Sequence, residues 1–149
     1  MKTFRQTRDV LRLSTQFHQQ LSDLYGRLSH VADKQRVKLL LDYLSRHEQA
    51  LTSCLDGYEA RIPRATLDTW LQYMPNDQPL GDVDLSSLGP DMTVREVTEL
   101  AFDFDDALMS FYRNLARESE SADVRVLFES LLQLEEHEQI ALRRENFAV

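Results

Sequence analysis

Five ionisable side chains stand at positions of this sequence where a helical pattern calls for apolar residues. Apolar residues recur at three- and four-residue intervals in four stretches, which is the spacing of helices with one face in a core. The interruptions are His18 in the first stretch, Glu48 in the second, Asp105 in the third, and Glu135 and Glu138 in the fourth. We therefore expect every helix to direct an ionisable group toward one shared level of the core.

Carboxylates and an imidazole cannot share a dry interior while charged and unpaired, because desolvation costs several kcal/mol per ion. Protons, buried Lys or Arg side chains, or divalent cations could neutralise them. The inward stripes contain no Lys or Arg, which disfavours the second choice. Oxygen ligands with one His suit iron or manganese, and zinc is a further choice. The sequence thus predicts a metal site formed by His18, Glu48, Asp105, Glu135 and Glu138, with protons as the alternative.

Two tyrosines accompany these groups. Tyr25 and Tyr112 each follow an interrupting residue, His18 or Asp105, by seven positions. We expect them in the core, with hydroxyls that hydrogen-bond the carboxylates from outside the ligand set. His47 is expected at the surface or rim, because adjacent helical residues cannot point the same way.

Four helices are needed to position these side chains, and the breakers divide the chain into two helical hairpins. All four Pro and two of the four Gly lie between residues 63 and 90. We expect one domain over 1–149, with a hairpin over about 7–60, a crossover over about 61–92 and a second hairpin over about 93–147. One long connection between two short-linked hairpins predicts an all-α antiparallel four-helix bundle with a single crossover.

Helix ends are also marked in the sequence. Asp33 is expected to cap the second helix, Thr93 with Glu96 reads as a capping box for the third, and Ser121 is expected to cap the fourth. In the crossover, the spacing of four apolar residues predicts a short helix that closes one end of the bundle, with Trp70 as a lid on the core: Leu67, Trp70, Leu71 and Met74.

The two hairpins resemble each other. A shift of 87 residues overlays them without a gap and matches Tyr25 with Tyr112 and Glu48 with Glu135. The same shift places His18 on Asp105. Because the paired Tyr and Glu are separated by the same distance in each half, the hairpins have one register and the bundle is expected to have pseudo-twofold symmetry.

Composition excludes some classes of partner. The chain of 149 residues has a net charge of −8, which argues against binding to nucleic acid or to an anionic membrane. The single Cys54 cannot form an internal disulfide and is expected as a small apolar side chain in the second helix. No apolar run is long enough to span a bilayer or to act as a secretory signal, so we expect a cytoplasmic protein.

In the order of these residues the chain resembles the ferritin-like superfamily, in its rubrerythrin-like branch, with a degenerate ligand motif. The half-motif is an acid, a Phe-Tyr or Leu-Tyr pair about seven residues on, a Leu-Ala pair, and Glu-x-x-His on the next helix. The second half has Asp105, Phe111-Tyr112, Leu115-Ala116 and Glu135 to Glu138; the first has His18, Leu24-Tyr25, Leu28-Ser29 and Glu48 to Leu51. Leu51 and Glu138 therefore replace the two motif histidines.

The resemblance implies a metal-binding protein with iron, or manganese or zinc, in a di-iron or mononuclear site of the oxidase or peroxide-handling kind. It assigns no catalytic residue, and whether the chain is an enzyme is left open. The alternative from a different class is a metal-free bundle of the same fold that acts as an interaction or scaffold protein.

A second apolar stripe runs along the first and third helices. It comprises Val10, Leu13, Phe17 and Leu24, echoed by Val97, Leu100, Phe104 and Phe111. The two stripes are expected either to pack on each other or to form the surface of a homodimer through these two helices.

Overall fold

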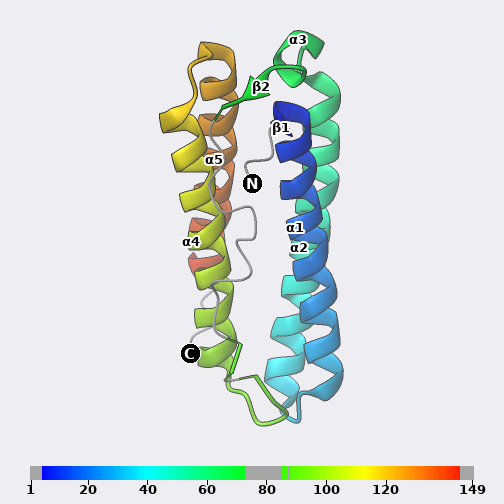
Figure 1. Ribbon diagram of the computed structural model, residues 1–149. Helices are drawn as coiled ribbons and strands as arrows, with labels where there is room; N and C mark the ends of the chain where they lie inside the picture. The colour runs from blue at the N-terminus through cyan, green and yellow to red at the C-terminus, as the bar shows by residue number, and fades with distance from the viewer. Residues whose placement is uncertain (1–4, 73–84, 87, 145–149) are drawn as a thin grey trace.

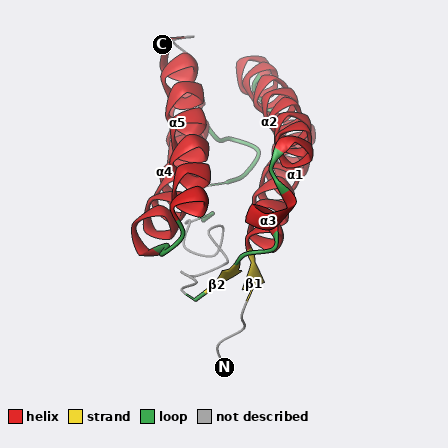
Figure 2. Cartoon of the chain, turned by 90° about the horizontal axis from the view of Figure 1, so that it is seen from above, coloured by secondary structure: helices red, strands yellow, loops and turns green. Residues whose placement is uncertain are grey.

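The computed structural model describes residues 5–72, 85–86 and 88–144, and four long antiparallel helices dominate it (Figure 1). Each hairpin is a pair of helices joined by a short link. The first pairs α1 (Thr7–Val31) with α2 (Gln35–Arg61), and the second pairs α4 (Val94–Glu118) with α5 (Ala122–Arg144). Seen from above, the two hairpins lie side by side (Figure 2). The predicted all-α bundle of two hairpins is confirmed.

The first part of the crossover is tied to the start of the chain. It contains the four-residue helix α3 (Arg64–Leu67) and the two-residue strand β2 (Trp70–Leu71), which pairs antiparallel with β1 (Arg5–Gln6). The backbone N–H of Thr7 donates to the carbonyl of Thr69 at 2.9 Å. These bonds fix the beginning of the crossover against the first turn of α1.

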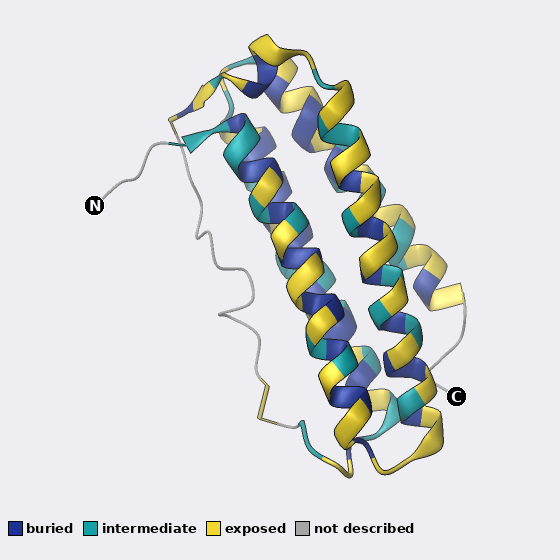
Figure 3. Cartoon of the chain, turned by 90° about the vertical axis from the view of Figure 1, so that its right-hand side faces the viewer, coloured by how far each residue is buried: buried dark blue, intermediate teal, exposed yellow. Residues whose placement is uncertain are grey.

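Apolar side chains fill the space between the hairpins, and the buried faces of the helices point inward (Figure 3). The second stripe is largely buried within one chain: the rings of Phe17 on α1 and Phe104 on α4 meet edge to face at 6.4 Å, and Phe104 meets Tyr25 at the same distance. Such edge-to-face pairs add to the stability gained by burial. The predicted homodimer is not tested by these contacts and stays a prediction.

A reciprocal pair of serines joins α1 and α2. The hydroxyl of Ser22 donates to the carbonyl of Ser45 at 2.9 Å, and the hydroxyl of Ser45 donates to the carbonyl of Ser22 at 2.8 Å. Small side chains allow two helix backbones to approach closely. Gly26, one turn beyond Ser22 on α1, lies near the hydroxyl of Ser45. This close approach sets how α2 presents Glu48 to α1.

The caps agree with the sequence in two of three cases. The Thr93 hydroxyl accepts from the N–H of Glu96 at 3.1 Å, and the Glu96 carboxylate accepts from the N–H of Thr93 at 3.0 Å, which completes the predicted box. The Ser121 hydroxyl accepts from the N–H of Val124 at 3.3 Å. Asp33 was the wrong choice, because the N-cap of α2 is Lys34, without a side-chain bond, while the Asp33 N–H donates to the carbonyl of Pro90.

The crossover contains a short helix, as predicted, but its extent differs from the prediction. The helical part, α3, ends at Leu67, and Trp70 and Leu71 continue as β2. Pairing with β1 turns alternate side chains to opposite sides, so Leu71 is buried and Trp70 is 60% exposed. Trp70 therefore does not cover the core, and Met74 lies outside the described residues.

Within the described ranges, none of the helices combines the length and the apolar character that crossing a membrane requires. Cys54 lies on α2, the helix expected for it, and its side chain is exposed.

Candidate functional site

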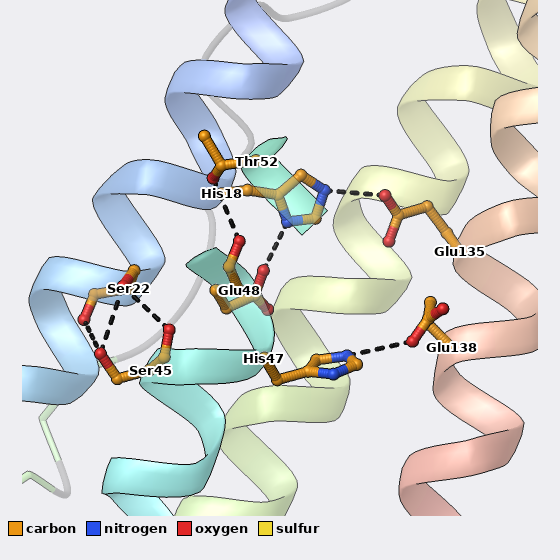
Figure 4. A network of polar contacts seen from close by, with 8 residues as sticks. All are labelled: His18, Ser22, Ser45, His47, Glu48, Thr52, Glu135 and Glu138. Atoms are coloured by element: carbon orange, nitrogen blue, oxygen red, sulfur yellow. Dashed lines mark hydrogen bonds and ion pairs between the residues drawn. The ribbon is translucent and has the colours of Figure 1, made fainter. Parts of the chain in front are cut away.

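The structure brings three of the predicted site residues into direct contact. The ring of His18 lies between two glutamates, with Nδ1 2.5 Å from Oε2 of Glu48 and Nε2 2.7 Å from Oε1 of Glu135 (Figure 4). The three residues come from α1, α2 and α5, so this Glu–His–Glu triad links the two hairpins. His18 has no exposed surface, and the two glutamate side chains are at most 4% exposed.

Both ring nitrogens can donate only if the imidazole carries a proton on each, which makes it a cation. Burial by itself would lower the pKa of His18, but the hydrogen bonds and the charges of Glu135 and Glu48 outweigh it and raise that pKa from 6.5 to about 10. At neutral pH the triad is therefore one positive charge between two acids. In this geometry a proton on the imidazole offsets part of the negative charge of the two glutamates.

Asp105 lies near the triad without a hydrogen bond to it. It is half-buried on α4, and burial, followed by the charges of Glu48 and Glu135, raises the pKa of Asp105 well above its usual value. An acid with a raised pKa is held toward its neutral form. Burial and the neighbouring acids thus favour the neutral form of Asp105.

Glu138 does not join the triad. It pairs with His47 of α2, with Nε2 of His47 3.4 Å from Oε2 of Glu138, and both side chains are partly exposed (Figure 4). The ring of His47 stacks on Tyr43 at 6.1 Å. This second link between α2 and α5 lies beside the triad and closer to solvent.

The two tyrosines are fully in the core, as predicted. Burial, followed by the charge of a nearby acid, raises the pKa of each hydroxyl; that acid is Glu48 for Tyr25 and Glu135 for Tyr112. Among the described residues, however, the hydroxyl of Tyr112 makes no hydrogen bond to either glutamate. Tyr112 is thus near enough to Glu135 for their charges to interact, but the hydrogen bond expected between the hydroxyl and a carboxylate is not formed.

These donors do not fit the di-metal centre that the resemblance implies. Such a centre takes a carboxylate from each of two helices and a Glu-x-x-His pair from each of the other two, all facing the ions. Here the two motif glutamates face the His18 ring, which lies between them, and Leu51 and Glu138 replace the motif histidines. In the part of the chain that the structure describes, no three His, Cys, Asp or Glu side chains converge on a point where an ion could be held.

No family model and no curated protein matches the sequence. Among solved structures, a protein from Thermotoga maritima described as a candidate ferritin-like diiron-carboxylate protein matches with a TM-score of 0.58 and 14% identity. The match covers 97% of this chain and 96% of that one. At this identity the likeness concerns the fold alone. The chain therefore has a ferritin-like fold, and its place in the rubrerythrin-like branch stays a prediction.

His47 lies at the rim, one of the two places expected for it: it is half-buried and contacts α5. Its contact with Glu138 was not predicted. The signal that could have found it is Glu138, one turn beyond Glu135 on the helix that faces α2. A polar partner on α2 fits a partly exposed acid at that place, and His47 is next to Glu48 in the sequence.

Proposed function

We propose that this chain is a metal-free ferritin-like bundle that acts as an interaction or scaffold protein, with the charged ring of His18 in the central place where the resemblance implies a metal ion. One observation carries the proposal: both ring nitrogens of His18 are bonded to core glutamates. Neither nitrogen has a lone pair left to offer an ion while those bonds exist.

Burial of the triad supports a structural role over a catalytic one. A reacting group must be reached by substrate, whereas His18 is fully buried and the glutamates nearly so. The triad instead joins α1 to both α2 and α5, so it holds the hairpins in one arrangement. Surface for partners is present elsewhere, since several large apolar side chains are at least half exposed: Val31, Leu39, Trp70, Val126 and Ile140.

The test is elemental analysis of protein purified from cells grown with added iron, manganese and zinc. We expect far less than one metal ion per chain. Nitrogen NMR at pH 7 should show two protonated ring nitrogens for one buried histidine, and that signal should vanish in His18→Gln. Near-stoichiometric metal that is lost in Glu48→Ala with Glu135→Ala would contradict the proposal.

Metal binding is the second candidate, and the cluster of acids around one level favours it. Asp105 feels the charges of Glu48 and Glu135, so three acids from three helices lie within electrostatic reach. To bind an ion, His18 would have to lose its extra proton and turn one nitrogen away from its glutamate. This candidate predicts that added iron(II), manganese or zinc raises the melting temperature, and that Glu135→Gln abolishes the rise.

A further inference from the structure

A pocket is lined by residues of β2 and of the turn between α4 and α5. Figure 1 shows β2 and this turn at the same end of the bundle. Its volume is about 350 Å³, at the small end of the range of about 300–1,000 Å³ that ligand sites occupy. Leu71 and Val124 are buried and form its apolar base, while Trp70, Glu118 and Glu120 are exposed around it.

Trp70 is an unusual wall for a surface pocket. Tryptophan is among the residues most buried on average, yet the side chain of Trp70 is 60% exposed. The backbone at Trp70 is held in place, because Gln6 pairs with it in the sheet, Thr7 bonds the preceding carbonyl, and Arg8 pairs with Asp68 at 2.7 Å. The exposed side chain of Trp70 lines the pocket from this position.

The charged side chains among the described residues that line the pocket are both negative. Glu118 and Glu120 line it, and the described lining residues include no Lys or Arg. Glu118 is also the last residue of α4, so the negative end of that helix dipole faces the same place. Arg117 contacts Glu118 at 3.3 Å, but both side chains are largely exposed, and an exposed pair of this kind is weak.

The start of α5 at the same turn does not make this an anion site. The Ser121 hydroxyl already accepts the N–H of Val124, and the Ser121 carbonyl accepts the N–H of Arg125. The Arg125 side chain donates to the carbonyl of Ser119 at 3.1 Å and is not among the described lining residues. The first turn of α5 thus satisfies part of its own donors with its cap.

We infer that the pocket beside Trp70 binds an organic cation, an ammonium or guanidinium group, between the indole face and the carboxylates of Glu118 and Glu120. An aromatic face attracts a cation through its quadrupole, and nearby carboxylates add charge attraction. This site goes beyond the proposed scaffold role and does not depend on the triad, so either idea can fail alone.

Trp70 is the only tryptophan in the chain, so its fluorescence reports directly on this pocket. The probes are arginine amide and spermidine as free cations, and a penta-arginine peptide as a protein-borne one. We expect a saturable change in Trp70 emission that weakens with added salt. If arginine amide or spermidine saturates, the ligand class is a free cation; if only the peptide does, it is a basic segment of a partner.

The variants make the test specific. Glu118→Gln with Glu120→Gln should weaken binding about tenfold, whereas Glu99→Gln with Glu129→Gln, the same charge change elsewhere on α4 and α5, should leave it unchanged. Trp70→Ala removes the fluorophore, so its binding is measured by calorimetry, and we expect the affinity for the cation to fall about five- to tenfold. Equal loss in both Glu pairs, no saturation with any cation, or an equal response to inorganic phosphate would overturn the inference.

Discussion

His18 is the residue on which the two core glutamates depend. Removing one member of a buried ionic cluster leaves its partners charged and unpaired, which costs about 3–5 kcal/mol. We expect His18→Leu to lower the free energy of unfolding at pH 7 by about that amount, measured by urea denaturation. His30→Leu, at an exposed position of the same helix, is the matched control and should change it by less than about 0.5 kcal/mol.

Removal of the two glutamates as well should restore stability to His18→Leu. Replacing a whole buried ionic cluster by apolar residues is often neutral or stabilising, because no charge is then desolvated. His18→Leu with Glu48→Leu and Glu135→Leu should therefore be more stable than His18→Leu alone. If the triple variant is no more stable than the single one, the loss in His18→Leu is a packing defect and the triad is not the cause.

Stability should fall as the solution is made alkaline. The folded pKa of His18, about 10, lies above its unfolded value of 6.5, so the folded state binds the extra proton. Its contribution is complete below pH 6.5 and is lost as the pH rises through 10. The raised pKa of Asp105 acts in the same direction, starting at lower pH.

Urea denaturation between pH 6 and 10.5 measures this effect. One proton of difference corresponds to a slope of about 1.4 kcal/mol per pH unit. Wild-type protein should become less stable across this range, and His18→Leu should lose less over the same interval. Parallel curves for the two proteins would mean that His18 is not protonated in the fold.

At this scale the sequence identified the participants but not their contacts. Glu48 and Glu135 could be placed inward because they break apolar stripes at equivalent positions of the two halves. The ring orientation of His18 depends on which carboxylates come within reach after the hairpins pack, and no spacing in the sequence reports that. Glu138 was expected inward by the same pattern, but the partly exposed His47 offered it a nearer partner.

At the scale of elements, the glycines inside helices offer a simple test. A Cβ at Gly26 of α1 would be 3.8 Å from the Ser45 hydroxyl, an ordinary contact, and a Cβ at Gly57 of α2 would meet nothing within 4 Å. Gly26→Ala and Gly57→Ala should each raise the free energy of unfolding by about 0.5–1 kcal/mol. Thermal and urea unfolding measure the change, and Ala50→Gly, at an exposed site of α2, should lower it by a similar amount.

Helix boundaries were the most predictable elements. Apolar residues with a helical period mark α1, α2, α4 and α5, because such a stripe is buried only when the segment is a helix with that face toward the core. The Thr93 box marks where α4 begins. The crossover was less predictable. Its apolar spacing fits a helix, but pairing with residues at the start of the chain made a strand of Trp70–Leu71, and such a long-range partner leaves no local signal.

At the scale of the whole molecule, the predicted homodimer through α1 and α4 can be measured. Most of the stripe on these helices packs inside the chain, and Leu13 and Leu24 are only partly buried. Sedimentation velocity at micromolar concentration should show a mass twice the 17.4 kDa of one chain, and Leu13→Gln with Leu24→Gln should shift it toward monomer. A monomer alone at these concentrations would end the dimer hypothesis.

The triad also bears on the order in which the chain assembles. The His18–Glu48 bond joins residues 30 positions apart within one hairpin, whereas the His18–Glu135 bond joins residues 117 positions apart. Contacts between distant positions close late, because the intervening chain must first be brought together. The first hairpin thus contains the His18–Glu48 contact by itself. Packing of the second hairpin adds Glu135, whose hydrogen bond and charge raise the pKa of His18 further.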